Sequence, residues 1–296
     1  MNRTSNALIV GALSVIGALI SGNSAATTTS ATASAFVSGA TVRQTITAGA
    51  KGATATAAQV IPSPIGDVFV SAEASSVPGA LGAAGVARTN GSPGGFQAQA
   101  SASWTDSFVI SAPGYDSAMT GTFSGAVQVT GELLVEFVGR VYSDSQSYAT
   151  VDIFPGTGYN GGRTVVSGSA RNLAGYDIAG SHTGTDNFSL IFVNVPFTFD
   201  QRIDLTLGLT VFADLNVIDA GATGRSDANY SNTMSWSGLS SVRDQGGSQP
   251  ITFTALSTGS GFNFANPTPV PELSSALLLA CGLIFVALIR RSPGRS

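Results

Sequence analysis

The sequence predicts an all-β fold, a two-sheet antiparallel β-sandwich of jelly-roll-like type, with a targeting segment at each end. Three observations carry this prediction. Apolar and polar residues alternate with period two in many short segments, clusters of Gly, Pro, Asn and Asp separate these segments, and no amphipathic helix of useful length lies between them. The body, predicted as residues 36–265, is long enough for one large domain with a hydrophobic core.

The N-terminal residues have the pattern of a secretory signal peptide. Arg3 precedes the apolar stretch 7–20, and a run of small residues follows. Cleavage is expected after Ala26, or as late as Ala35, so residues 1–26 are predicted to engage the export machinery and then to be removed. An uncleaved N-terminal anchor is the alternative, although the apolar stretch is short for a stable span.

Two stretches near the start of the body are low in complexity. Residues 25–58 are rich in Thr, Ala and Ser, which predicts a disordered segment, or a first strand preceded by a flexible leader. Residues 75–95 are mostly Gly, Ala and Pro, which predicts a long loop.

The strands are predicted from alternation. It is longest from Ile203 to Val217, where one face is apolar over fifteen residues. Segments 119–129 and 133–141 alternate on either side of Gly131, which predicts a hairpin. Pro196 interrupts segment 188–199 and cannot donate to a ladder, so this segment is expected at an edge or a bend. The other predicted strands are Val68–Ala74, Ala98–Ile110, Tyr148–Phe154, Arg163–Ser169, Thr233–Val242 and Ile251–Ser257.

The composition narrows the classes of function. Charged residues are only 10% of the chain, which contains 36 glycines and a single lysine. Residues 36–270 hold nine basic and sixteen acidic residues, a formal charge of −7, so the basic patch that a nucleic-acid partner requires is missing. The only cysteine, Cys281, lies in the C-terminal apolar stretch, so the body has no disulfide, thiolate zinc site or cysteine nucleophile.

The C-terminal residues combine a spacer, an apolar stretch and a basic end. Residues 266–271 form a Pro-rich spacer, and residues 273–289 are predicted as a single transmembrane helix of roughly 25 Å, slightly short for a bilayer. Arg290 and Arg291 follow as cytoplasm-retained positive charge. An ordinary C-terminal membrane anchor explains the same features.

Residues 270–296 resemble the PEP-CTERM sorting signal, which joins a short motif, a hydrophobic helix and a basic cluster. Leu273 stands where the family usually has a second proline. The resemblance implies recognition by a membrane-embedded exosortase, cleavage near the motif, and transfer to the cell surface or the extracellular polysaccharide matrix. The residues that carry the match are Val270, Pro271, Glu272, Ser274, Arg290 and Arg291.

The body has a looser resemblance to the same exported proteins. Segments 229–239, 242–247 and 253–262 are similar to their last two strands, which an Asp-x-x-Gly turn connects, and segment 104–110 is similar to an early strand. The resemblance implies a surface β-sandwich and transfers no active site.

Candidate chemistry is sparse, and no catalytic residue is predicted. Asp214, Asn216 and Asp219 supply hard oxygen ligands near a strand end, so calcium is the one possible cofactor, although turn formation explains the same residues. His182, the only histidine, is predicted to lie in a loop, because no nucleophile elbow accompanies it. Glu132 and Glu136 are expected about 13 Å apart on one strand, too far for a retaining glycosidase pair.

The leading hypothesis is a non-enzymatic exported protein, held briefly by its C-terminal helix and then left at the cell surface or with extracellular polysaccharide. A carbohydrate-binding module is the alternative, and paired aromatic residues on one exposed surface would distinguish it. Trp104 and Trp236 lie in predicted strands, where packing in the core is the default. A glycan-active hydrolase is the third hypothesis, which requires convergent carboxylates or His182 bonded to both an acid and a serine.

Overall fold

The structure is a computed structural model that describes residues 27–37, 40–48, 52–61, 66–155, 164–172, 179–247 and 249–268. The predicted signal peptide (1–26), the predicted sorting motif at 270–274 and the predicted helix at 273–289 lie outside these residues. Within the described residues, no helix is long and apolar enough to cross a membrane.

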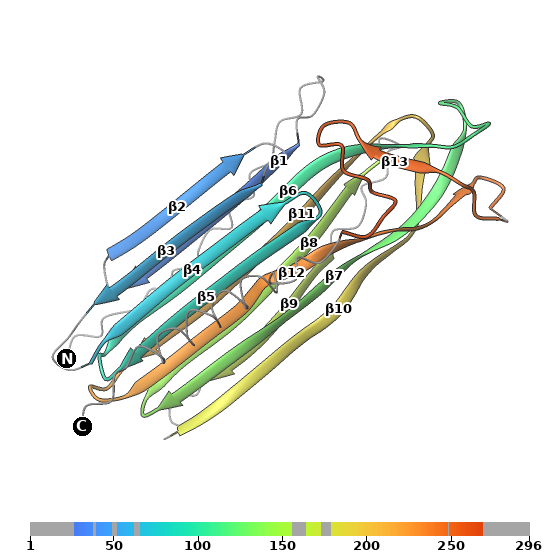
Figure 1. The fold of residues 1–296 in the computed structure, drawn as a ribbon. Coiled ribbons are helices and arrows are strands. Elements are labelled where there is room, and N and C mark those ends of the chain that lie inside the picture. Colours follow the sequence, from blue (N-terminus) through green and yellow to red (C-terminus); the bar gives the residue numbers. More distant parts are fainter. Residues whose placement is uncertain are drawn as a thin grey trace, which may run out of the picture.

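Thirteen β-strands and no helix make up the regular structure of the described residues (Figure 1). Because each predicted strand overlaps an observed one, the all-β prediction is confirmed. The strands are β1 (Thr28–Val37), β2 (Ala40–Ala48), β3 (Ala53–Ile61), β4 (Val68–Val77), β5 (Ala80–Asn90), β6 (Gly94–Ser111), β7 (Thr120–Val138), β8 (Val141–Phe154), β9 (Thr164–Asn172), β10 (Ala179–Thr198), β11 (Arg202–Val217), β12 (Thr223–Asp244) and β13 (Thr254–Ser257).

The strands form two antiparallel sheets that pack face to face. Sheet A has the order β2-β1-β6-β11-β8-β9, with β13 also paired to β6, and sheet B has the order β10-β7-β12-β5-β4-β3. The edge strands β2 and β3 contact each other, as do β9 and β10, so neighbouring edges of the two sheets meet on both sides. A jelly roll has eight strands in two Greek keys, and the described parts of these sheets hold seven and six. The β-sandwich is confirmed, and the jelly-roll-like type stays a prediction.

The core between the sheets changes in side-chain size along its length. Inward positions of β1 and β6 near the β2 side are alanines such as Ala33 and Ala100, both fully buried. A Cβ built on Gly85 of β5 would lie 3.3 Å from the Cβ of Ala98, so the sheets approach closely there. At the other end the core is filled by buried aromatic residues, among them Trp104, Phe108, Phe123, Phe197, Trp236 and Phe264.

The small-residue half of the core corrects two predictions. The segment 25–58, expected to be disordered or to hold one strand, contains β1, β2 and the larger part of β3, and the segment 75–95, expected to be a loop, contains β5. These strands were missed because their inward residues are alanine and glycine, whose small size the narrow space between the sheets requires. The body therefore begins ahead of residue 36, with β1.

Gly131 does not form the predicted hairpin turn. It lies inside β7, which runs unbroken from Thr120 to Val138. A Cβ at this position would lie 2.3 Å from the ring of the fully buried Tyr230 on the adjacent strand β12. The glycine is present because an aromatic ring occupies the space of its side chain.

Of the two predictions that concern β10, one is confirmed and one is wrong. Pro196 lies in this edge strand of sheet B, next to a register shift between Phe192 and Val195, as expected for a proline in a sheet. Asn194, within the shift, has a φ of 53°, which asparagine tolerates better than most residues. The loop prediction for His182 is wrong, because this residue lies in β10, where its ring stacks on Phe137.

Gly131→Ala should lower the free energy of unfolding by about 1–3 kcal/mol, because the new methyl group overlaps the Tyr230 ring. Gly95→Ala in β6 is the matched control, since a Cβ there has no neighbour within 4 Å. The control should be neutral or stabilising by about 0.4–1 kcal/mol. Urea unfolding curves measure both, and equal effects would contradict the assignment of Gly131 to ring packing.

Candidate functional site

The ends of the body meet along one edge of β6. This strand pairs with β1 as far as Thr105 and with β13 from Phe108 onward, so strands from opposite ends of the chain share one edge. Asp106 lies at the junction between them and is only 2% exposed.

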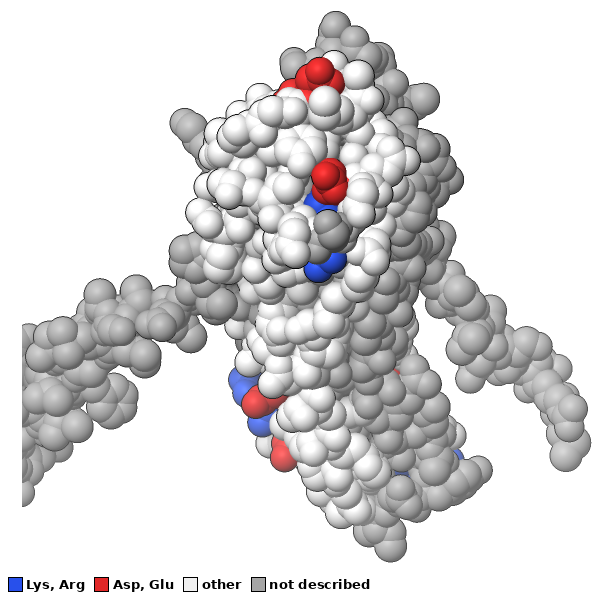
Figure 2. Space-filling view, turned by 90° about the vertical axis from the view of Figure 1, so that its right-hand side faces the viewer, with Lys and Arg blue, Asp and Glu red and all other residues white. Residues whose placement is uncertain are grey.

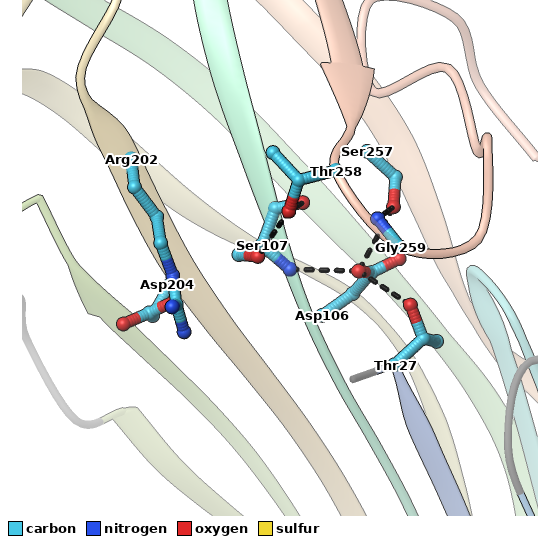
Figure 3. Close-up of polar contacts among 8 residues, drawn as sticks. All are labelled: Thr27, Asp106, Ser107, Arg202, Asp204, Ser257, Thr258 and Gly259. Atoms are coloured by element: carbon cyan, nitrogen blue, oxygen red, sulfur yellow. Dashed lines mark hydrogen bonds and ion pairs between the residues drawn. The ribbon is translucent and has the colours of Figure 1, made fainter. Parts of the chain in front are cut away.

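Asp106 is held by hydrogen bonds from three segments of the chain (Figure 3). Its Oδ1 accepts from Thr27 Oγ1 at 2.7 Å, Ser257 Oγ at 2.9 Å and the backbone N of Ser107 at 2.7 Å, and its Oδ2 accepts from Ser260 Oγ at 2.6 Å. Ser257 Oγ also accepts from the backbone N of Ser260, at 2.8 Å, which fixes the turn over the carboxylate. All four donors to Asp106 are hydroxyl or amide groups, so the site has the character of a structural clasp.

The C-terminal segment beyond β13 packs onto the aromatic end of the core. Phe264 stacks on Trp104 with ring centroids 5.4 Å apart, and its carbonyl oxygen accepts the Trp236 indole N–H at 2.8 Å. Trp104 and Trp236 are both 0% exposed, which confirms their assignment to the core. Neither side chain is placed to stack on a sugar.

Two of the predicted calcium ligands share one face of a strand, and the third lies beyond the end of that strand. Asp214 and Asn216 are exposed on the outer face of β11, whereas Asp219 follows the strand and forms an exposed ion pair with Arg140 at 3.7 Å. No group of three or more His, Cys, Asp or Glu side chains in the described part of the chain could hold a metal ion. Calcium stays a prediction. The direct neighbour of Asp214 across the sheet is Asp144 of β8.

The residues considered for hydrolysis lie apart. Glu132 and Glu136 are both exposed on β7, and Glu136 pairs with Arg225 at 3.6 Å. Among the described side chains, no hydrogen bond joins His182 to a carboxylate or a serine hydroxyl. The hydrolase hypothesis stays untested.

A shallow groove of about 430 Å³ crosses one end of the outer face of sheet B. It is lined by Arg88, Arg225, Glu136 and Ser181, which are register neighbours on four adjacent strands. Arg225 is already paired with Glu136 and Asp227, and Arg88 lies over a phenylalanine ring at 4.4 Å. The arginines therefore already have partners within the protein.

The outer face of sheet A carries the strongest candidate for a binding surface. Tyr148 of β8 and Phe212 of β11 are half-buried there, and their rings meet edge to face with centroids 5.8 Å apart. Alternation placed both residues in predicted strands, but gave no sign that they were neighbours. Only the pairing of Tyr148 with Thr210 in the β8–β11 register brings the two rings together.

Comparison with known proteins identifies no relative. No protein-family model, curated protein or solved structure matches this chain. Its site is therefore interpreted from its own residues.

Asp106→Ala should lower the free energy of unfolding by roughly 3 kcal/mol or more, because the clasp hydroxyls lose a buried charged acceptor. Asp204→Ala is the matched control on the neighbouring strand, where Asp204 forms a half-buried pair with Arg202 at 2.7 Å. The Asp204→Ala control should lower the free energy of unfolding by only about 0–1 kcal/mol. Thermal unfolding measures both, and hydrogen exchange should show loss of protection in β13 for Asp106→Ala alone. Unchanged protection would contradict the clasp.

Asp214→Asn should raise the melting temperature at neutral pH. Desolvation and the nearby Asp144 carboxylate raise the pKa of Asp214, so the folded protein binds this proton more tightly than the unfolded chain does. Ionised Asp214 therefore destabilises the fold, an effect absent below the ordinary pKa of 3.8 and complete above the raised value.

The melting temperatures of wild type and Asp214→Asn should converge as the pH falls from neutral towards the ordinary aspartate pKa. Asp219→Asn, at an exposed ion pair, is the control and should change little at neutral pH. A difference for Asp214→Asn that stays constant with pH would show that the cause is not electrostatic.

Proposed function

We propose that this chain is a non-enzymatic exported protein, sorted through its C-terminal segment and left at the cell surface or in the extracellular polysaccharide matrix. The export machinery and an exosortase-type processing enzyme are its partners in this pathway. A membrane holds the chain through residues 273–289 until processing.

The observation that carries the proposal is the hydrogen bond that ties Thr268 to the body. The backbone N of Thr268 donates to the carbonyl oxygen of Trp236 at 2.8 Å, so the packed body continues through the first residues of the Pro-rich spacer. The sorting motif begins two residues later, at Val270. A predicted motif that follows a packed domain this closely in the sequence suits processing of an already folded body.

The N-terminal side supports the earlier of the two signal cleavage positions. Thr27 is 4% exposed and bonded to Asp106, and β1 lies inside sheet A between β2 and β6. Cleavage after Ala26 leaves this strand whole, whereas cleavage after Ala35 removes most of it and exposes the edge of β6.

The surface composition also supports an extracellular location within hydrated polysaccharide. Figure 2 shows charged side chains as a few isolated spots on the described part of one end of the molecule. Outward positions of sheet A are mostly Ser, Thr and Gln, as in the row formed by Thr32, Ser101 and Thr210. Such a surface is hydrated through hydroxyl and amide groups.

Replacing Pro271 and Glu272 together by alanine should keep the protein in the membrane fraction with its C-terminal segment attached. Pro269→Ala, in the same spacer, is the matched control and should be released normally. Cell fractionation followed by mass spectrometry of the intact protein measures both outcomes. The released wild-type protein should begin at Thr27 and end close to the motif.

Two results would oppose the proposal. One is release of the Pro271/Glu272 variant with the same mass as the wild type. The other is a full-length protein that remains in the cytosol. A released protein that begins at Phe36 would contradict only the assignment of the signal cleavage site.

A further inference from the structure

Several aromatic side chains interrupt the polar outer face of sheet A, and among them Tyr148 and Phe212 meet ring to ring. Tyr148 and Phe212 lie among Ser, Thr, Gln and Asp side chains on strands at the centre of the sheet, not at an edge. Both are half-buried, and neither belongs to the hydrophobic core between the sheets. We call these two residues, together with Gln99 and Gln146, the aromatic platform.

Hydrogen bonds orient the platform. The hydroxyl of Tyr148 donates to Gln146 Oε1, and Gln146 Nε2 in turn donates to Asp144 Oδ2. Phe212 lies directly between Gln99 and Gln146 in the register of β6, β11 and β8. The Phe212 ring is therefore bordered on both sides by amide groups, which can donate and accept hydrogen bonds.

The position beside Tyr148 carries a hydroxyl group. Gly208 of β11 pairs with Thr150 of β8, one outward position along from Tyr148. A Cβ on Gly208 would lie 2.5 Å from Thr150 Oγ1, so the Thr150 hydroxyl lies over the glycine. This hydroxyl adds a polar group beside the Tyr148 ring.

The charge next to the platform limits the ligand. Asp214 and Asp144 are direct register neighbours beside Phe212 and Gln146, so two carboxylates lie next to the platform. The negative charge of Asp144, after desolvation, is a cause of the raised pKa of Asp214. A polyanion would be repelled here, while carboxylates accept hydrogen bonds well from hydroxyl groups.

We infer that the aromatic platform on the outer face of sheet A binds a neutral polysaccharide. The aromatic rings contact the apolar faces of sugar rings, and the amides and carboxylates bond the sugar hydroxyls. This activity is independent of how the chain is sorted. Contact between two copies through the same face is the competing use of the surface, but it would bring Asp144 and Asp214 of one copy towards acids of another.

The test is affinity electrophoresis of the full-length chain in mild detergent, in native gels containing hydroxyethyl cellulose, dextran or alginate. The wild type should be retarded by at least one of the two neutral polymers, and not by the polyanion alginate. Tyr148→Ala and Phe212→Ala should each weaken the apparent affinity by roughly fivefold to tenfold, the effect of losing one stacking ring.

Phe69→Ala is the matched control. Phe69 is also a half-buried phenylalanine on an outward strand position, but it lies in sheet B, where Arg88 covers its ring. The apparent affinity of the Phe69→Ala variant for the neutral polymers should equal that of the wild type. The melting temperature of every variant is measured to detect loss of folding. If an alanine variant of the platform is unstable, Tyr148→Phe replaces it in the test, and this variant should retain most of the binding because it keeps the ring.

Three results would overturn the inference. They are no retardation by either neutral polymer, retardation by alginate as strong as by the neutral polymers, and equal loss of binding in the Phe69→Ala control. Sedimentation velocity without polymer tests the competing use. A dimer that Tyr148→Ala dissociates would assign the platform to self-association.

Discussion

The continuous edge of β6 is the constraint on which the rest of the structure depends. One strand of eighteen residues is paired first by β1, near the N-terminal side of the body, and then by β13, near its C-terminal side. Where two strands meet end to end, the backbone ladder is interrupted and polar groups are left to be satisfied. The buried Asp106 carboxylate accepts from one of them, the backbone N of Ser107, and its bonds to Thr27, Ser257 and Ser260 join the first and last parts of the body to the same central strand.

The hydrogen bonds of Asp106 fix β13 and therefore set the path of the chain after this strand. Because β13 is fixed, the chain after it turns back and places Phe262 and Phe264 against Trp104, where they close the aromatic end of the core. The backbone N of Thr268 then donates to the carbonyl oxygen of Trp236, two residues ahead of the predicted sorting motif in the sequence.

Size matching between opposed residues explains the remainder of the core. In one half, alanines face alanines and the sheets lie close. In the other, rings fill the space, and glycines of neighbouring strands make room for them, as Gly131 does for Tyr230 and Gly125 does for Phe192. The low complexity of the chain is therefore a consequence of close packing. It is compatible with a body of regular strands, although composition of this kind is common in disordered segments.

The sequence by itself determined the all-β class, the long strand at Ile203–Val217, the place of Pro196 at a sheet edge and the burial of both tryptophans. Period-two alternation and the missing amide of proline are local properties, so a short window of sequence reveals them. Tertiary structure alone decided that alanine-rich segments form strands, that Gly131 lies within a strand, and that Asp106 and the Tyr148–Phe212 pair occupy special positions. Each of these depends on a partner far away in the chain, such as Ser257, which is 151 residues from Asp106. Only the register of the assembled sheets brings such partners together.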